Sequence, residues 1–167
     1  KGFALFSGIV TLGVMVLGVT YWNNAEHLTH QSEWIPALGT SFHLGVDGMG
    51  KVLCLLTAIS FPIILLATFN NHYSAAPRFY ALMLLSQAGL MGVFLAMDAL
   101  LFYFFWELAL IPVYFLCSFW GGEKRIAVTF KFFIYTFVGS LLMLVALIYL
   151  YFQAGQSFDI KAFYALH

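Results

Sequence analysis

One acidic residue lies inside a strongly apolar part of this chain. Glu107 occupies the run from Leu100 to Leu116, where its neighbours are aliphatic and aromatic side chains. A carboxylate at membrane depth must lose its charge, pair with a cation or meet water, and such residues commonly mark ion pathways. Because burial and nearby charges change how readily a carboxyl group holds a proton, Glu107 is a candidate proton carrier. The alternative is a structural carboxylate that hydrogen-bonds a neighbouring helix.

Lys131 is a second ionisable residue within an apolar segment. It can act as a charge partner on a proton path, or its long stem can carry the ammonium group out to the membrane surface. Counted from the loop between their segments, the depths of Lys131 and Glu107 differ by roughly 10 Å at 1.5 Å per residue. A direct salt bridge is therefore not expected. Water, Tyr103, Tyr135 or an acid elsewhere in the protein would have to connect the two.

Pro112 follows Glu107 in the same segment. Proline has no N–H to donate to the carbonyl four residues back, which here belongs to Leu108, so a backbone acceptor is freed next to the acid. A water bound there would extend a polar path. A simple kink used for packing is an equal alternative.

The elements that hold these residues are membrane-spanning helices. The chain is 63% hydrophobic and only 8% charged, which leaves too little polar surface to coat a soluble globule. Alternating barrel strands are absent from the pattern, so an all-α, polytopic transmembrane helix bundle is predicted. Five stretches approach the roughly 20 residues needed to span a bilayer. They are approximately 2–22, 50–69, 79–97, 99–120 and 126–152.

Small residues and acids between these stretches have structural interpretations. Ala88, Gly92 and Ala96 recur every four positions and are expected to pack helices closely. Asp47 and Asp98 each precede a helix, where a side-chain oxygen can cap the free N–H groups; proton entry is the weaker alternative for Asp47.

Flanking cations indicate an orientation. One side carries Lys1, Arg78, Lys124 and Arg125, and the other carries Lys51 and Lys161. The positive-inside rule then places the loop from Gly121 to Arg125 in the cytoplasm. Because the chain begins without Met and ends directly after an apolar helix, we expect it to be a fragment of a longer protein.

Several functions are excluded by composition and spacing. A net charge of zero without a basic tract argues against nucleic-acid binding. Cys54 and Cys117 lie in apolar runs and are interpreted as small buried hydrophobes. The histidines all fall in predicted loops or at the terminus, which argues against a bundle with paired haem ligands. They are His27, His30, His43, His72 and His167.

Four motifs together resemble the NuoM/ND4 family, the antiporter-like subunits (chain M) of respiratory complex I. They are Phe102 to Pro112 (FYFFWELALIP), Trp120-Gly121-Gly122, Lys131 to Thr136 (KFFIYT) with Gly139-Ser140, and the upstream Leu44 to Gly48 (LGVDG). The resemblance covers nearly the whole chain. It implies a subunit of about fourteen helices built from inverted repeats, of which this chain would hold family helices two to six.

The resemblance also implies roles for single residues. Glu107 matches an essential proton-coupling glutamate of the family, and Lys131 matches a further position, as a possible proton path or charge partner. The central Lys of the first repeat would lie beyond His167. The implied mechanism is charge coupling, in which a change in positive charge near Glu107 moves its proton through transient water to a neighbouring site.

The implied function is proton translocation within NADH:quinone oxidoreductase, an enzyme in which this subunit holds no redox centre. No cofactor is expected on this chain; NADH, quinone, FMN and iron–sulfur clusters belong to partner subunits. The expected partners are other membrane subunits, including antiporter-like neighbours, and the bilayer. The expected location is the inner membrane of a bacterium, with an organellar inner membrane as the alternative. Rival functions are a cation/proton antiporter or membrane hydrogenase subunit of the same superfamily, and a purely structural membrane scaffold.

Overall fold

Five long helices dominate the computed structural model, which describes residues 1–21 and 29–166. They are α1 (Gly2–Tyr21), α2 (Gly48–Ala67), α3 (Ala76–Leu95), α4 (Ala99–Trp120) and α5 (Arg125–Gln153). All five are long and apolar enough to cross a membrane. The predicted all-α transmembrane fold class is confirmed. The largest difference in helix ends is at α3, which begins at Ala76 instead of Phe79. Trp22, His27 and His167 lie outside the described residues.

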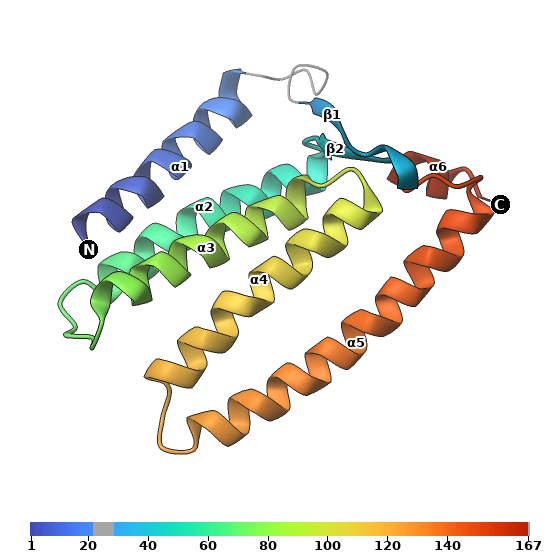
Figure 1. Cartoon of the computed structure of the whole chain (residues 1–167). Coiled ribbons are helices and arrows are strands. Elements are labelled where there is room, and N and C mark those ends of the chain that lie inside the picture. Colours follow the sequence, from blue (N-terminus) through green and yellow to red (C-terminus); the bar gives the residue numbers. More distant parts are fainter. Residues whose placement is uncertain (22–28, 167) are drawn as a thin grey trace.

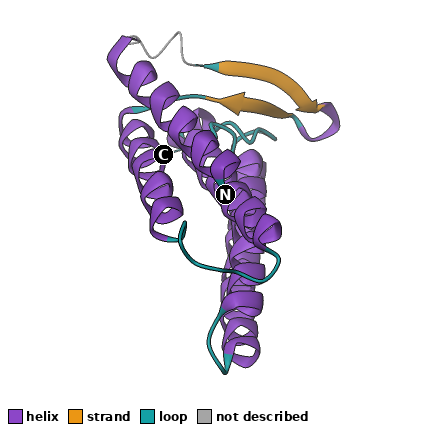
Figure 2. Cartoon of the chain, turned by 90° about the vertical axis from the view of Figure 1, so that its left-hand side faces the viewer, coloured by secondary structure: helices purple, strands orange, loops and turns teal. Residues whose placement is uncertain are grey.

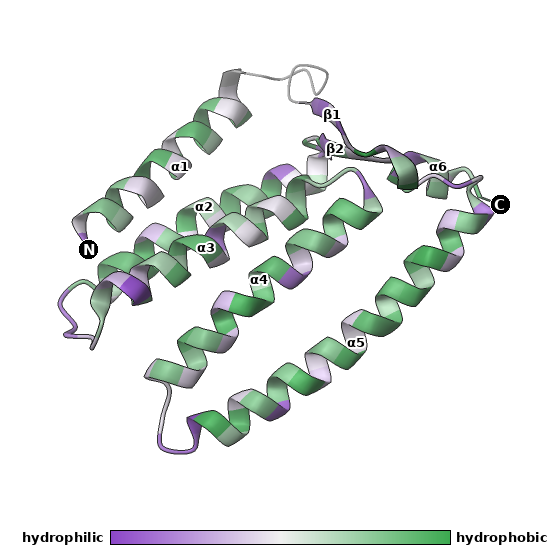
Figure 3. Ribbon diagram, in the orientation of Figure 1, coloured by the Kyte–Doolittle hydropathy of each residue, from purple (hydrophilic) through white to green (hydrophobic). Residues whose placement is uncertain are grey.

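The helices run antiparallel to one another and pack mainly against their neighbours in the chain (Figure 1). Apolar residues cover the helices on most sides, and hydrophilic residues gather in the connections (Figure 3). At one end of the bundle, Leu65 of α2 and Phe79 and Tyr80 of α3 form a buried cluster with Ala4 of α1. The Tyr80 hydroxyl donates to the carbonyl of Thr68 across 3.1 Å, which ties α3 to the end of α2.

The two ends of the bundle differ in structure. The chain starts at the end that holds the α2–α3 and α4–α5 loops, whereas all the strands lie at the other end (Figure 1). There β1 (His30–Ile35) and β2 (Thr40–Leu44) form an antiparallel hairpin, and the short helix α6 (Ile160–Tyr164) lies beside it. We call this the hairpin end. The hairpin reaches across the ends of the helices (Figure 2).

The hairpin is an addition to the five predicted helices, because the predicted stretches 2–22 and 50–69 leave the segment between them without an assigned element. Its turn is a 3₁₀ segment, η2 (Pro36–Leu38), closed by Gly39 in the left-handed conformation with φ +64°. A side chain rarely adopts that backbone, so glycine suits the turn. Proline and glycine at this spacing between two polar-apolar runs are the local signal that could have revealed it.

Asp47 and Asp98 cap helices, as predicted. Asp47 accepts a hydrogen bond from the backbone N–H of Gly50 at the start of α2. Asp98 accepts from the N–H groups of Leu100 and Leu101 at the start of α4, across 2.9 and 3.1 Å. Both satisfy donors that a helix start leaves without a partner.

The α3–α4 contact depends on glycines, but the predicted stripe was partly wrong. Ala88 is exposed, whereas Gly89 is buried against α4. A Cβ at Gly89 would lie 2.8 Å from the Cα of Ala109, and one at Gly92 would collide with the ring of Phe105. The helices therefore cross where α3 has no side chain. The four-residue repeat found one of these glycines and missed the other.

Replacing Gly89 with Ala is expected to destabilise the α3–α4 pair by about 1–3 kcal/mol, the usual cost of overpacking a core. The added methyl group meets the backbone of Ala109, which cannot turn aside as a side chain can. The free energy of unfolding in mild detergent measures the effect. Gly122→Ala is the control, because a Cβ at Gly122 has open space around it. Equal stability of the two variants would contradict this packing.

Candidate functional site

Glu107 lies near the middle of α4, half-buried, with one carboxylate oxygen in an unusual setting. Its Oε1 atom is buried and has no hydrogen-bond partner among the described residues. A buried acceptor without a partner costs about 1–3 kcal/mol, and more when it is charged. Such an atom in a native protein calls for a proton, a water or a further group. The proton-carrying role of Glu107 stays a prediction, and this oxygen is the feature of the fold that bears on it.

Two hydroxyl groups lie beside Glu107. Tyr103, one helical turn earlier in α4, interacts with both the Glu107 carboxylate and the Ser140 hydroxyl of α5. Ser140 is buried and donates to the carbonyl of Phe137 across 2.9 Å, so its oxygen keeps a lone pair for a neighbour. Glu107, Tyr103 and Ser140 thus form a polar group between two apolar helices. Such groups can exchange protons through hydroxyls and bound water.

Lys131 does not join this group. It is exposed, whereas the buried residues of α5 are Thr129 and Ser140. Lys131 precedes Ser140 by nine residues (140 minus 131), which places it roughly 13 Å nearer the α4–α5 loop at 1.5 Å per residue. The structure therefore separates Lys131 from Glu107, in line with the depths counted along the sequence.

Pro112 is fully buried, in contrast to the half-buried Glu107. Its ring packs within the bundle, as a kink used for packing requires, and a water at the freed Leu108 carbonyl stays a prediction. Sequence alone could not separate the two, because the burial of a proline ring depends on which neighbour lies against it.

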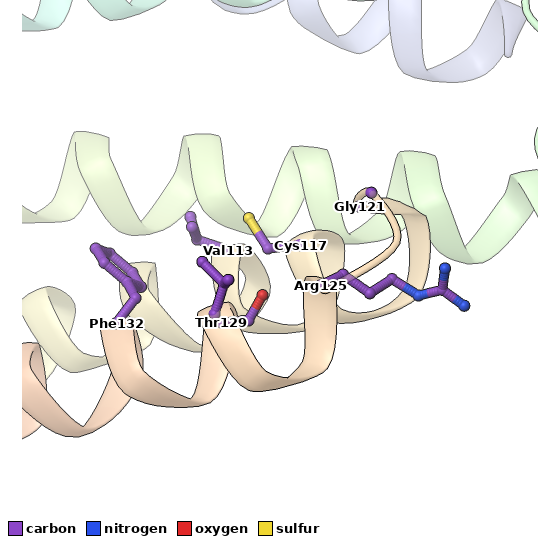
Figure 4. A pocket seen from close by; sticks show the side chains of 8 residues that line it. Val113, Cys117, Gly121, Arg125, Thr129 and Phe132 are labelled. Atoms are coloured by element: carbon purple, nitrogen blue, oxygen red, sulfur yellow. The ribbon is translucent and has the colours of Figure 1, made fainter.

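The space between α4 and α5 near their loop is apolar. Side chains of Val113 and Cys117 from α4 face Thr129 and Phe132 from α5, while the Arg125 guanidinium extends away from them (Figure 4). This cavity measures about 370 Å³ and does not include Glu107. A mainly apolar cavity therefore lies between the α4–α5 loop and the part of α4 that holds Glu107.

A second carboxylate organises the hairpin end. Asp98 is 2% exposed, and its Oδ2 accepts from the backbone N–H of Ser41 in β2 across 3.2 Å. Its Oδ1 caps α4 at the same time. Burial raises the pKa of the Asp98 carboxyl above its ordinary value, although these backbone N–H groups oppose the shift; Asp159 adds to it. The prediction of a helix cap missed the bond to Ser41, because no sequence pattern links residues 41 and 98.

Comparison with known proteins identifies related chains. Residues 96–166 match the family model described as NADH:quinone oxidoreductase/Mrp antiporter, TM. The chain is 37% identical over 165 residues to the F(420)H(2) dehydrogenase subunit M of Methanosarcina mazei, covering 97% of this chain and 33% of that protein. It is 37% identical over 160 residues to NADH-quinone oxidoreductase subunit M of Rhodobacter capsulatus, covering 94% and 31%.

A solved structure shows the same fold. A chain of respiratory complex I from Thermus thermophilus matches with a TM-score of 0.80 and 29% identity, over 95% of this chain and 34% of that chain. The described helices thus correspond to about a third of a larger membrane subunit.

Proposed function

Because the chain belongs to the family of NADH:quinone oxidoreductase and Mrp antiporter membrane subunits, we propose that it is part of a proton-translocating subunit of NADH:quinone oxidoreductase. The observation that carries the proposal is the buried, unpartnered Oε1 of Glu107 in the middle of α4. A carboxyl group there can accept and release a proton inside the membrane, which a purely structural helix does not need.

The proposed mechanism is charge coupling at Glu107. A positive charge that approaches the carboxylate stabilises its ionised form and releases the proton toward Tyr103, Ser140 and transient water. Moving one charge across a potential of 100 mV requires about 2.3 kcal/mol. A charge about 4 Å away contributes about 4 kcal/mol at an effective dielectric constant near 20, so a nearby charge supplies enough energy.

Lys131 takes a long-range role in this proposal. At a separation of roughly 10 Å or more from Glu107, the same dielectric constant gives at most about 2 kcal/mol, which is too small to drive the step alone. The cation that comes close to Glu107 therefore has to come from a part of the subunit beyond these helices. The curated relatives are about three times as long as this chain.

The energy source lies outside this chain in the proposal. The two relatives are named for different electron donors, F(420)H(2) and NADH, yet this chain is 37% identical to each. We therefore assign NADH, FMN, iron–sulfur clusters and quinone to partner subunits. This chain contributes only the proton carrier that responds to their chemistry.

The proposed partners of this chain are other membrane subunits, including antiporter-like neighbours. The proposed location is the inner membrane of a bacterium, and the cations at the loop end support a cytoplasmic position for that end.

A cation/proton antiporter is the second candidate, because the matching family model also covers Mrp antiporters. Ion uptake separates the two in inside-out vesicles that carry the full-length protein in its complex. With NADH as the electron donor, proton uptake should persist in sodium-free buffer and be abolished by a protonophore. Proton movement that requires sodium, or that an imposed sodium gradient drives without NADH, would favour the antiporter and contradict a proton pump.

A further inference from the structure

A second buried polar group lies on α3, the helix that packs against the α4 of Glu107. Gln87 of α3 is 4% exposed, and its Nε2 has no hydrogen-bond partner among the described residues. An amide left without partners in an apolar interior costs about 1–3 kcal/mol. Buried polar groups in native proteins nearly always have a hydrogen-bond partner. The partner of the Gln87 amide must therefore be something other than the described side chains.

Gln87 lines a cleft of about 390 Å³ between α1, α3 and α4. Its polar lining is Gln87 together with Ser7 and Thr11 of α1. Thr11 donates its hydroxyl proton to the carbonyl of Ser7 across 2.9 Å, so its oxygen remains free to accept a bond. An amide donor and two hydroxyl groups thus share one space near the middle of the bundle.

The cleft reaches the hairpin end. Along α3 its lining runs from Leu84 to Leu95, a rise of roughly 16 Å at 1.5 Å per residue. Leu44, at the end of β2, lines it as well. The N–H of Gly45 donates to the carbonyl of Leu95 across 2.8 Å, so this end of the cleft lies directly beneath the hairpin. One end of the cleft therefore lies where the bundle meets the aqueous surface of the membrane.

We propose that this cleft is a water-filled vestibule that opens at the hairpin end and hydrates the amide of Gln87. A bound water takes up about 30 Å³ and needs two to four polar partners, so the cleft has room for several. The amide and the two hydroxyl groups supply those partners at the inner end. A lipid tail could fill the same space but would leave the amide unsatisfied, and water removes that cost.

The vestibule is distinct from the site at Glu107. Phe105 lines the cleft, and Glu107 follows two residues later on α4. Two residues turn a helix by about 200°, so their side chains point to nearly opposite sides. The close contact of Gly92 with the Phe105 ring closes α3 against α4 between them. The proposal concerns hydration and stands whether or not Glu107 carries protons.

Thiol labelling from the hairpin side tests the vestibule in the full-length protein, assembled in its membrane complex and freed of native cysteines. A charged, membrane-impermeant methanethiosulfonate reagent is applied to Thr11→Cys and, as matched control, to Ile9→Cys. Ile9 lies at nearly the same depth but points to the opposite side of α1 and is 52% exposed. Because the thiolate is the reactive form and needs a polar surrounding, we expect Thr11→Cys to react about tenfold faster or more.

Adding Gln87→Leu to Thr11→Cys should lower that rate toward the control, since the inner end of the vestibule then loses its amide. Equal, slow reaction of both single variants would overturn the proposal. So would reaction of Thr11→Cys with a lipid-soluble maleimide alone, which would mean that lipid fills the cleft. Equal, fast reaction of both would mean that α1 is hydrated all around, which also contradicts a defined vestibule. Assembly of the complex, measured on native gels, shows that each variant is folded.

Discussion

Glu107→Gln is expected to lower NADH-driven proton uptake to about a tenth of the wild-type rate or less, because proton transfer through a positioned side chain commonly contributes a hundredfold or more. The amide has the size of the acid but cannot release a proton at any physiological pH. The amide carries no charge, so a buried atom without a partner costs less at position 107 than an ionised carboxylate oxygen does, and the protein should fold and assemble. Proton uptake and assembly are measured on the same inside-out vesicles.

Two further variants serve as controls for the loss of proton uptake. Glu107→Asp keeps a carboxyl group on a shorter stem and should retain part of the uptake. Glu123→Gln removes an acid from the exposed α4–α5 loop and should leave uptake unchanged. Normal uptake in assembled Glu107→Gln vesicles would make the residue structural and contradict the charge-coupling mechanism. Loss of both uptake and assembly would instead identify Glu107 as a packing residue, which also contradicts it.

Asp98→Ala is expected to lower the free energy of unfolding by about 3 kcal/mol, roughly 1 kcal/mol for each of three backbone hydrogen bonds. Two of these bonds cap α4, and the third holds Ser41 of the hairpin against the α3–α4 turn. The main consequence should be a loosened hairpin, because the remaining tie between this turn and β2 among the described residues is then the bond that the N–H of Met97 donates to the carbonyl of His43. Unfolding in bicelles with increasing denaturant measures the loss.

Asp159→Ala is the matched control for Asp98→Ala. Asp159 also caps a helix, the short α6, but it accepts one backbone bond, from Lys161, and is partly exposed. Its replacement should cost about 1 kcal/mol. Equal losses for the two variants would show that the bond to Ser41 contributes nothing.

The raised pKa of Asp98 adds a pH dependence with a definite sign. The folded protein keeps the Asp98 proton to a higher pH than the unfolded chain does. The stability that this proton contributes is full below the ordinary pKa of Asp, about 4, and is lost as pH rises through the folded value. Relative to Asp98→Asn, the wild-type protein should therefore become less stable as pH rises through that window. The opposite slope would mean that the backbone N–H groups outweigh burial at Asp98.

The sequence by itself determined the class of the protein and the residue to test first. Five apolar stretches predict five spanning helices, because only helices satisfy their own backbone inside lipid. A lone acid in such a stretch identifies Glu107, since an ionisable side chain in an apolar membrane helix is rare and can be recognised without knowing how the helices pack. The caps at Asp47 and Asp98 follow from local backbone chemistry in the same way.

Only the tertiary structure decided which polar groups meet. Tyr103 and Ser140 join Glu107, Lys131 is held away from it, and Gln87 faces Ser7 and Thr11 across a cleft. These relations depend on the rotation of each helix about its axis. Where most residues on every face are apolar, hydrophobic periodicity barely indicates that rotation. It is set instead by close contacts such as Gly89 against Ala109, which join residues far apart in the chain.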